Sequence, residues 1–106
     1  WTRPLSQVVA VNEIAGSTPT EFRLEQNYPN PFNPSTTISY QLSTSTLVSL
    51  KVFDILGREI TTLVNEVNTP GRYSVTWNAV NFSSGVYFCR FAAGGHTEIR
   101  TMVLIK

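Results

Sequence analysis

Cysteine, histidine and charged side chains are all scarce in this chain of 106 residues. The single cysteine, Cys89, excludes an internal disulfide and any zinc site that is built from several cysteines. The single histidine, His96, lies in a predicted glycine-rich turn, whereas Cys89 lies within a predicted strand, so we expect a surface histidine and a buried cysteine rather than a catalytic pair. These absences favour a protein that is not an enzyme and that holds no cofactor or metal.

The few charged residues nearly balance, since they make up 14% of the chain and give a net charge of +1. An average soluble domain has about 25% charged residues, and here serine, threonine and asparagine replace them with 10, 13 and 8 residues. No strong field favours nucleic acid or an anionic membrane, and no apolar run approaches the roughly 20 residues that span a bilayer. We therefore expect no nucleic-acid partner and no small-molecule substrate, and a polar, weakly charged surface is typical of secreted β-proteins.

Two further chemistries have little support in the sequence. Asp54, Glu59 and Glu66 flank one predicted hairpin, where two carboxylates could form a glycosidase pair, but Asp54 more simply caps its own turn. The aromatic residues around Trp77 could stack on sugars, but a two-layer fold needs large side chains in its core. We expect turn and core roles for both sets.

A proline-asparagine block over residues 27–34 reads Asn-Tyr-Pro-Asn-Pro-Phe-Asn-Pro. Each proline fixes φ and removes an N–H donor, and the residue before it is pushed to extended conformations. The block therefore predicts a stiff, extended lead-in that is neither a helix nor a central strand. We expect Tyr28 and Phe32 to anchor it against the body, and Asn30 and Asn33 to bond to local backbone as turn residues do.

Short segments of alternating apolar and polar residues follow the block, with turn residues between them. In the last of these segments Ile99, Val103 and Ile105 fall on one face. This pattern predicts an all-β, antiparallel, immunoglobulin-like β-sandwich of about seven strands. The predicted strands are 36–42, 48–53, 58–64, 73–77, 86–91 and 97–105, with a possible seventh near 20–24, and polar loops are predicted over 65–71 and 78–85.

The N-terminal residues 1–20 form a separate segment before the sandwich of residues 21–106. Within it, Gln7, Val8, Val9, Ala10 and Val11 form a short β-branched run that is bounded by turn residues. The run is too short for periodicity to assign. Residues 1–20 are therefore interpreted as a linker, the tail of a preceding passenger, or a donor strand for another subunit.

Several motifs occur in an order that is typical of one family. Residues 24–38, which contain the proline-asparagine block, resemble the opening signature of type A C-terminal sorting domains of the type IX secretion system. An apolar strand with an Asp-x-x-Gly-Arg turn, a strand from Gly71 to Asn78, and the segments 84–88 and 102–106 follow in that family's order. The candidate sorting-motif residues are Asn27, Tyr28, Pro29, Asn30, Pro31, Phe32, Asn33, Pro34, Gly57, Arg58, Gly85, Tyr87 and Lys106.

The resemblance implies a seven-stranded immunoglobulin-like domain, similar also to part of the flagellar hook-capping protein, that is not itself catalytic. It implies export through the periplasm and across the outer membrane of a Gram-negative bacterium, with the protein secreted or held at the cell surface. The implied partners are the outer-membrane export machinery and a sortase-like peptidase that attaches the passenger to the surface.

A structural role is the alternative to a sorting role. In the sorting role, the last predicted strand ends at Lys106, so we expect an edge that the export receptor can bind by strand addition. In the alternative, Gln7–Val11 completes the sheet of a neighbouring copy, and the chain self-associates into an extracellular filament or tube.

Overall fold

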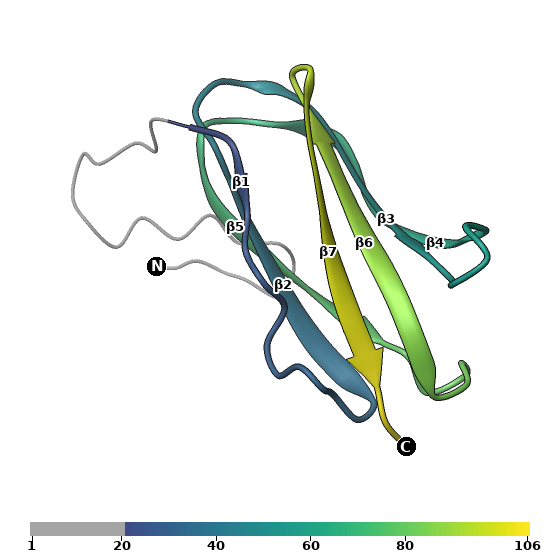
Figure 1. The fold of residues 1–106 in the computed structure, drawn as a ribbon. Helices are drawn as coiled ribbons and strands as arrows, with labels where there is room; N and C mark the ends of the chain where they lie inside the picture. The colour runs from purple at the N-terminus through teal and green to yellow at the C-terminus, as the bar shows by residue number, and fades with distance from the viewer. Residues whose placement is uncertain (1–20) are drawn as a thin grey trace.

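Two antiparallel sheets face each other in the part of the chain that this computed structural model describes, residues 21–106 (Figure 1). One sheet has the order β1-β2-β5 and the other β4-β3-β6-β7. This arrangement confirms the predicted antiparallel β-sandwich of seven strands, while its immunoglobulin-like relationship stays a prediction. The strands are β1 Arg23–Leu24, β2 Ser35–Leu42, β3 Thr46–Phe53, β4 Glu59–Asn68, β5 Gly71–Asn78, β6 Gly85–Ala93 and β7 His96–Leu104.

The core lies between the sheets and consists of the apolar residues that alternate along each strand. Along β3, for example, Val48, Leu50 and Val52 are fully buried, and the residues between them face outward. Cys89 is 1% exposed in this core, where burial raises the pKa of its thiol to about 12 and keeps it protonated. Trp77 is also buried and contacts other aromatic rings, so no platform for sugars is exposed there.

Strand β4 is longer than its polar sequence predicts. It extends to Asn68, where a loop over 65–71 was expected. Register shifts between Leu50 and Lys51 and between Val52 and Phe53 mark irregularities in the pairing of β3 with β4, and such bulges interrupt the alternation on which the prediction relied. At the end of β4 the Asn68 carboxamide oxygen accepts a buried hydrogen bond of 2.8 Å from the Tyr40 hydroxyl.

The inward face of β7 is also different from the prediction. Met102 and Leu104 are buried, whereas Ile99 and Ile105 are more than half exposed. The pairing with β6 sets this phase, because Met102 lies opposite the inward-facing Tyr87. The C-terminal half of β7 has apolar residues on both faces, so alternation alone could not identify the buried one.

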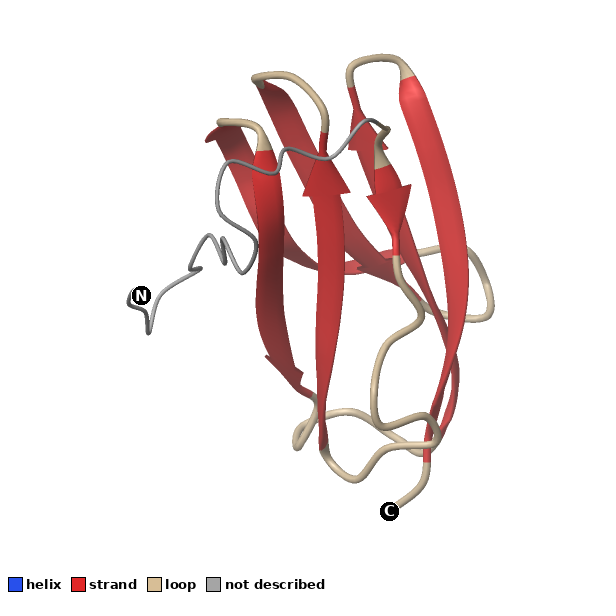
Figure 2. Cartoon of the chain, turned by 90° about the vertical axis from the view of Figure 1, so that its left-hand side faces the viewer, coloured by secondary structure: helices blue, strands red, loops and turns tan. Residues whose placement is uncertain are grey.

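The described chain begins and ends at opposite ends of the sandwich (Figures 1 and 2). Phe22 lies against the Gly94 turn at one end, and Lys106 bonds to Ser84 at the other. We call the second end the C-terminal pole; it comprises residues 28–34, 78–85 and 104–106. No helix among the described residues is suited to crossing a bilayer.

Two leucines on β3 test this assignment of the core. Leu50→Ala is expected to lower the free energy of unfolding by about 2–5 kcal/mol, because it leaves a cavity between the sheets. Leu47→Ala, at a position that is 57% exposed, is expected to change it by less than about 0.5 kcal/mol. Denaturant unfolding measures both, and equal losses would contradict the assigned inward face of β3.

Candidate functional site at the edge of the last strand

Residues 22–32, which we call the crossing segment, pass from the three-stranded sheet to the edge of β7. Leu24 pairs with Tyr40 in the first sheet, and Phe32 makes a parallel bridge to Leu104 at the edge of the second. Between these points the chain bends at Pro29–Pro31. The proline-asparagine block is neither a helix nor part of a named strand, as predicted, but it also bends, because the chain must turn to reach a different sheet.

The Asn30 side chain takes the place of a peptide group at the edge of β7. Its amide nitrogen donates to the Thr101 carbonyl at 3.3 Å, and its oxygen accepts from the Val103 amide at 2.9 Å. The Gln26 side chain also donates to the Thr101 carbonyl at 2.9 Å. The expectation that Asn30 bonds to local backbone is wrong, since its partners lie more than 70 residues away in sequence.

Phe32 continues the same edge with main-chain bonds. Its amide donates to the Val103 carbonyl at 2.9 Å, and its carbonyl accepts from the Ile105 amide at 3.0 Å. Its ring is 2% exposed and packs against Trp77 with centroids 5.6 Å apart, which confirms the predicted anchor. Tyr28, the other predicted anchor, is 81% exposed, so its ring does not anchor the block. Its backbone bonds to Thr37.

Two buried polar side chains support the bend of the crossing segment. The Thr36 hydroxyl donates to the Pro29 carbonyl at 2.8 Å, and the Asn27 amide donates to the Thr36 hydroxyl at 3.0 Å. Asn27 and Thr36 are 3% and 1% exposed. Buried polar groups that satisfy one another in this way fix a backbone path. Asn27 is therefore buried, where it supports the bend, and does not lie on the exposed surface.

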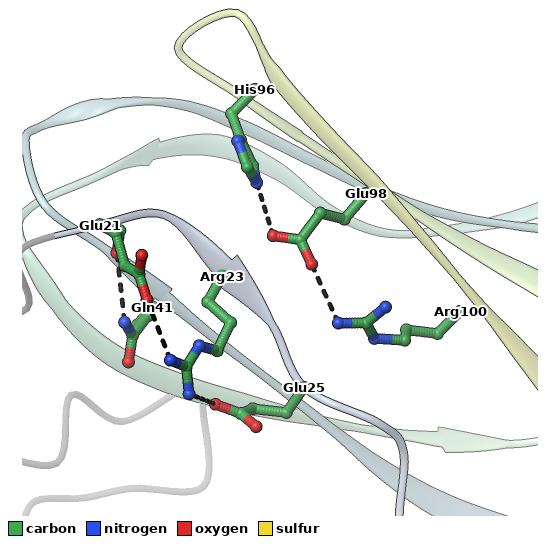
Figure 3. Close-up of polar contacts among 7 residues, drawn as sticks. All are labelled: Glu21, Arg23, Glu25, Gln41, His96, Glu98 and Arg100. Atoms are coloured by element: carbon green, nitrogen blue, oxygen red, sulfur yellow. Dashed lines mark hydrogen bonds and ion pairs between the residues drawn. The ribbon is translucent and has the colours of Figure 1, made fainter.

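The other half of the β7 edge is held by side chains (Figure 3). The Arg100 guanidinium donates to the Leu24 carbonyl at 3.1 Å and to Glu98 at 3.1 Å. The Glu98 carboxylate also contacts the His96 ring at 2.5 Å, and this ring lies 6.0 Å from that of Phe22. Together with Asn30 and Phe32, these contacts connect the crossing segment to β7 along most of its length. The expected open edge for strand addition is therefore covered.

The Glu98 carboxyl titrates below its ordinary range. Partial burial raises its pKa, but hydrogen bonds from His96 and the Leu24 backbone, together with the charge of Arg100, outweigh burial and lower it. The charged form is thus the one that the folded edge stabilises. Inward-pointing charged residues are a known way to protect an edge strand.

Three further candidate residues lie at the C-terminal pole, near the proline-asparagine block. The Lys106 ammonium donates to the Val80 carbonyl at 2.6 Å, and the Tyr87 hydroxyl donates to the Ser83 carbonyl at 2.6 Å. Both bonds secure the 78–85 loop, in which Gly85 begins β6. This loop is joined to the proline-asparagine block by a bond from the Ala79 amide to the Pro34 carbonyl. The structure therefore brings Gly85, Tyr87 and Lys106 together with residues 27–34.

Gly57 and Arg58 lie elsewhere, in the turn between β3 and β4 on the far side of the four-stranded sheet (Figure 1). Gly57 has φ +82°, which favours glycine. The Asp54 carboxylate accepts bonds from the amides of Leu56 and Arg58 and from the Arg58 side chain, and the bond from the Arg58 amide lowers its pKa most. This confirms that Asp54 caps its own turn.

The described residues bring together no reaction centre from the candidates weighed above. Cys89 lies opposite Arg100 in the β6–β7 pairing, whereas His96 lies opposite Ala93, several residues away. Within residues 21–106, no group of three or more His, Cys, Asp or Glu residues is placed to hold a metal ion. Glu59 instead pairs with Lys51 at 3.3 Å.

Sequence reasoning missed Gln26, Thr36, Glu98 and Arg100, which hold the crossing segment in place. For β7 a signal was present, because His96, Glu98 and Arg100 alternate in phase with the buried Met102 and Leu104. Charged residues on the inward face of a terminal strand indicate a protected edge. No comparable signal identifies Gln26 or Thr36.

Comparison with known proteins matches the sequence of this chain to a family. The sequence profile of a family described as secretion system C-terminal sorting domain matches residues 26–106. No curated protein matches the chain. The matched range begins at Gln26 and includes β2 to β7, so it contains both the proline-asparagine block and the strand edge that the block covers.

Substitution of Asn30 tests the closure of the β7 edge. Asn30→Ala is expected to speed hydrogen exchange at the Val103 amide and to lower the free energy of unfolding by about 1 kcal/mol, because two side-chain bonds are lost. Asn30→Asp keeps the acceptor and should preserve most of the protection. Asn33→Ala changes an exposed asparagine of the same block and serves as the control. Unchanged exchange at Val103 in Asn30→Ala would contradict the role of this side chain.

The lowered pKa of Glu98 predicts a pH dependence of stability. Because folding lowers this pKa, the stability that Glu98 contributes is complete above the pKa of the unfolded state, about 4.3. This stability is lost as the pH falls through the pKa of the folded state. Wild type should therefore exceed Glu98→Gln in stability at neutral pH, and the difference should shrink as the pH falls below the pKa of the unfolded state. Denaturant midpoints at several pH values measure it, and a constant difference over that range would refute the linkage.

Proposed function

Because the match covers most of the chain, the protein belongs to the secretion system C-terminal sorting domain family, and we propose that it is a signal for export by the type IX system. In this role the folded sandwich is what the export machinery binds, and no bond is made or broken within it. The protein carrying it would pass through the periplasm of a Gram-negative bacterium and be secreted or held at the cell surface.

The observation that supports this proposal best is the joining of two distant sequence segments into one surface. The proline-asparagine block is bonded to the last strand through Asn30 and Phe32, and Lys106 is bonded to the adjacent loop. A receptor that binds the C-terminal pole would therefore contact both segments only when the domain is folded. Tyr28 and Ile105, which are 81% and 53% exposed, offer apolar contacts on this pole.

We propose that residues 1–20 connect the sandwich to a preceding passenger, with the domain boundary at about residue 21. The candidate strand Gln7–Val11 lies outside the described residues. After export, a sortase-like peptidase would cut before the sandwich and attach the passenger to the cell surface. The described chain begins at the end of the sandwich away from the C-terminal pole, which supports this arrangement because cutting and receptor binding would use different ends.

Self-assembly into a filament or tube is the alternative function, and one observation favours it. The outer edge of β5 is eight residues long and, within the described part of the chain, pairs with no further strand. Regular, unprotected edges invite strand addition. In this alternative Gln7–Val11 of another copy would add to β5, and size-exclusion chromatography with electron microscopy would detect the resulting assemblies.

Export of a fusion protein tests the sorting role. The full 106-residue chain is fused to the C-terminus of a periplasmic reporter and expressed in a strain with an intact type IX system. The reporter should reach the cell surface or medium, and it should stay in the periplasm of an otherwise identical strain that lacks the export channel. Periplasmic retention in the intact strain, with the domain folded, would refute the proposed function.

A further inference from the structure

The two outer faces of the sandwich differ sharply in chemistry. On the three-stranded sheet the outward residues of β2 and β5 are polar, and they pair as Thr37 with Thr76, Ser39 with Ser74, and Gln41 with Arg72. On the four-stranded sheet, Phe53 and Phe88 lie opposite each other on the outward face. An antiparallel sheet with one face in water ordinarily has polar residues there. The aromatic pair therefore needs a separate explanation.

A groove runs beside this aromatic pair, between the β3–β4 turn and the outer face of the sheet. Its walls are Phe53, Phe88, Ile99, Arg90 and Gly57, and its volume is about 420 Å³. The turn is held rigid by the bonds of Asp54 described above. Such a fixed wall lowers the conformational entropy that the turn must lose when a ligand binds. At the tip of the same turn Ile55 and Leu56 are 70% and 73% exposed, which extends the apolar surface.

The charges around the groove favour an acidic occupant. Arg90 lies directly opposite Lys51 in the β3–β6 pairing, and like charges at opposed positions are destabilising. Glu59 pairs with Lys51 at 3.3 Å and also feels the charge of Arg90, so two cations share this carboxylate. The Arg90 guanidinium lies over the Phe53 ring, 5.0 Å from its centroid, and it borders the groove. A further carboxylate placed there would offset the repulsion between the two cations.

We propose that this groove is a docking surface for an acidic, apolar segment of a partner protein, one that presents a carboxylate to Arg90 beside aliphatic side chains on Phe53 and Phe88. The inference rests on the proposed function in naming that partner as a component of the export machinery. An anionic membrane fits less well, because such binding needs clusters of several cations and the net charge of the chain is only +1.

Binding of two short peptides tests the chemistry of the groove directly. The probes are a peptide in which aspartate pairs alternate with leucine pairs and a matched peptide with lysine in place of aspartate, each added to the full chain. The pairs place both kinds of side chain on each face of an extended segment. The acidic peptide should bind and the basic one should not. Arg90→Glu should weaken the acidic peptide about tenfold, which corresponds to about 1.4 kcal/mol. Ile55→Ser/Leu56→Ser should weaken it as well.

The matched control lies on the same sheet away from the groove. Leu47 and Val67 are 57% and 68% exposed and are directly opposed on β3 and β4, so Leu47→Ser/Val67→Ser also removes two exposed aliphatic side chains. This control should bind the acidic peptide within about twofold of wild type, which is less than 0.5 kcal/mol. Each variant should be fully folded under the binding conditions, as its unfolding curve would show, which ensures that any loss of binding is local.

Export of the same variants separates this inference from the proposed function. If the wild-type fusion is exported and Arg90→Glu is exported about tenfold less, the groove is supported. If both are exported equally, or if the two peptides bind alike, the groove is not a docking surface while the sorting role stands. Failure of the wild-type fusion refutes the sorting role, and the peptide result then decides the groove alone. Two results would overturn the choice of partner. One is Arg90-dependent binding of anionic vesicles in the absence of peptide binding, and the other is an Arg90-dependent dimer.

Discussion

The hydrogen bonding between the crossing segment and the outer edge of β7 is the interaction on which this structure depends most. It joins the two sheets along one side of the sandwich. Different kinds of chemical group make the bonds at successive points along the edge. Side chains of Glu98 and Arg100 hold Leu24 at one end, the Asn30 carboxamide replaces a peptide group in the middle, and the Phe32 main chain completes the edge at the other end. A strand edge that would otherwise attract other chains is thereby made part of the fold.

This closure gives the proline-asparagine block a physical meaning. Prolines cannot donate to a ladder, so a regular strand could not pass through residues 27–34. The block instead makes a bend that Thr36 and Asn27 support from within, and it presents one asparagine and one phenylalanine to β7. The remaining side of the sandwich, at β4 and β5, has no such cover within the described residues. The domain is thus asymmetric both in its edges and in its outer faces.

Most of the fold was predictable from the sequence because it follows from alternation. The predicted strands 36–42, 48–53 and 86–91 lie within β2, β3 and β6, where buried apolar residues alternate regularly along each strand. Alternation failed at β4, where irregular pairing and a buried Asn68 break the pattern, and at β7, where both faces carry apolar residues.

The candidate site was less predictable, because its contacts join segments that are far apart in the chain. Local turn chemistry was the natural expectation for Asn30, yet its partners are Thr101 and Val103. Tyr28 and Phe32 have similar sequence surroundings but opposite exposure, and only the path of the backbone between the two sheets decides which of them is buried. The pairing of Phe53 with Phe88, and hence the groove, likewise required the register of two strands.

The placement of the two described chain ends has a mechanical consequence. β7 has nine residues, and at about 3.3 Å per residue a strand of this length spans about 30 Å. Any cargo joined before residue 21 therefore starts roughly that far from Lys106, with the rigid sandwich as a spacer between them. A receptor closed around Lys106 would therefore bind at the end of the sandwich that lies away from the attachment point of the cargo.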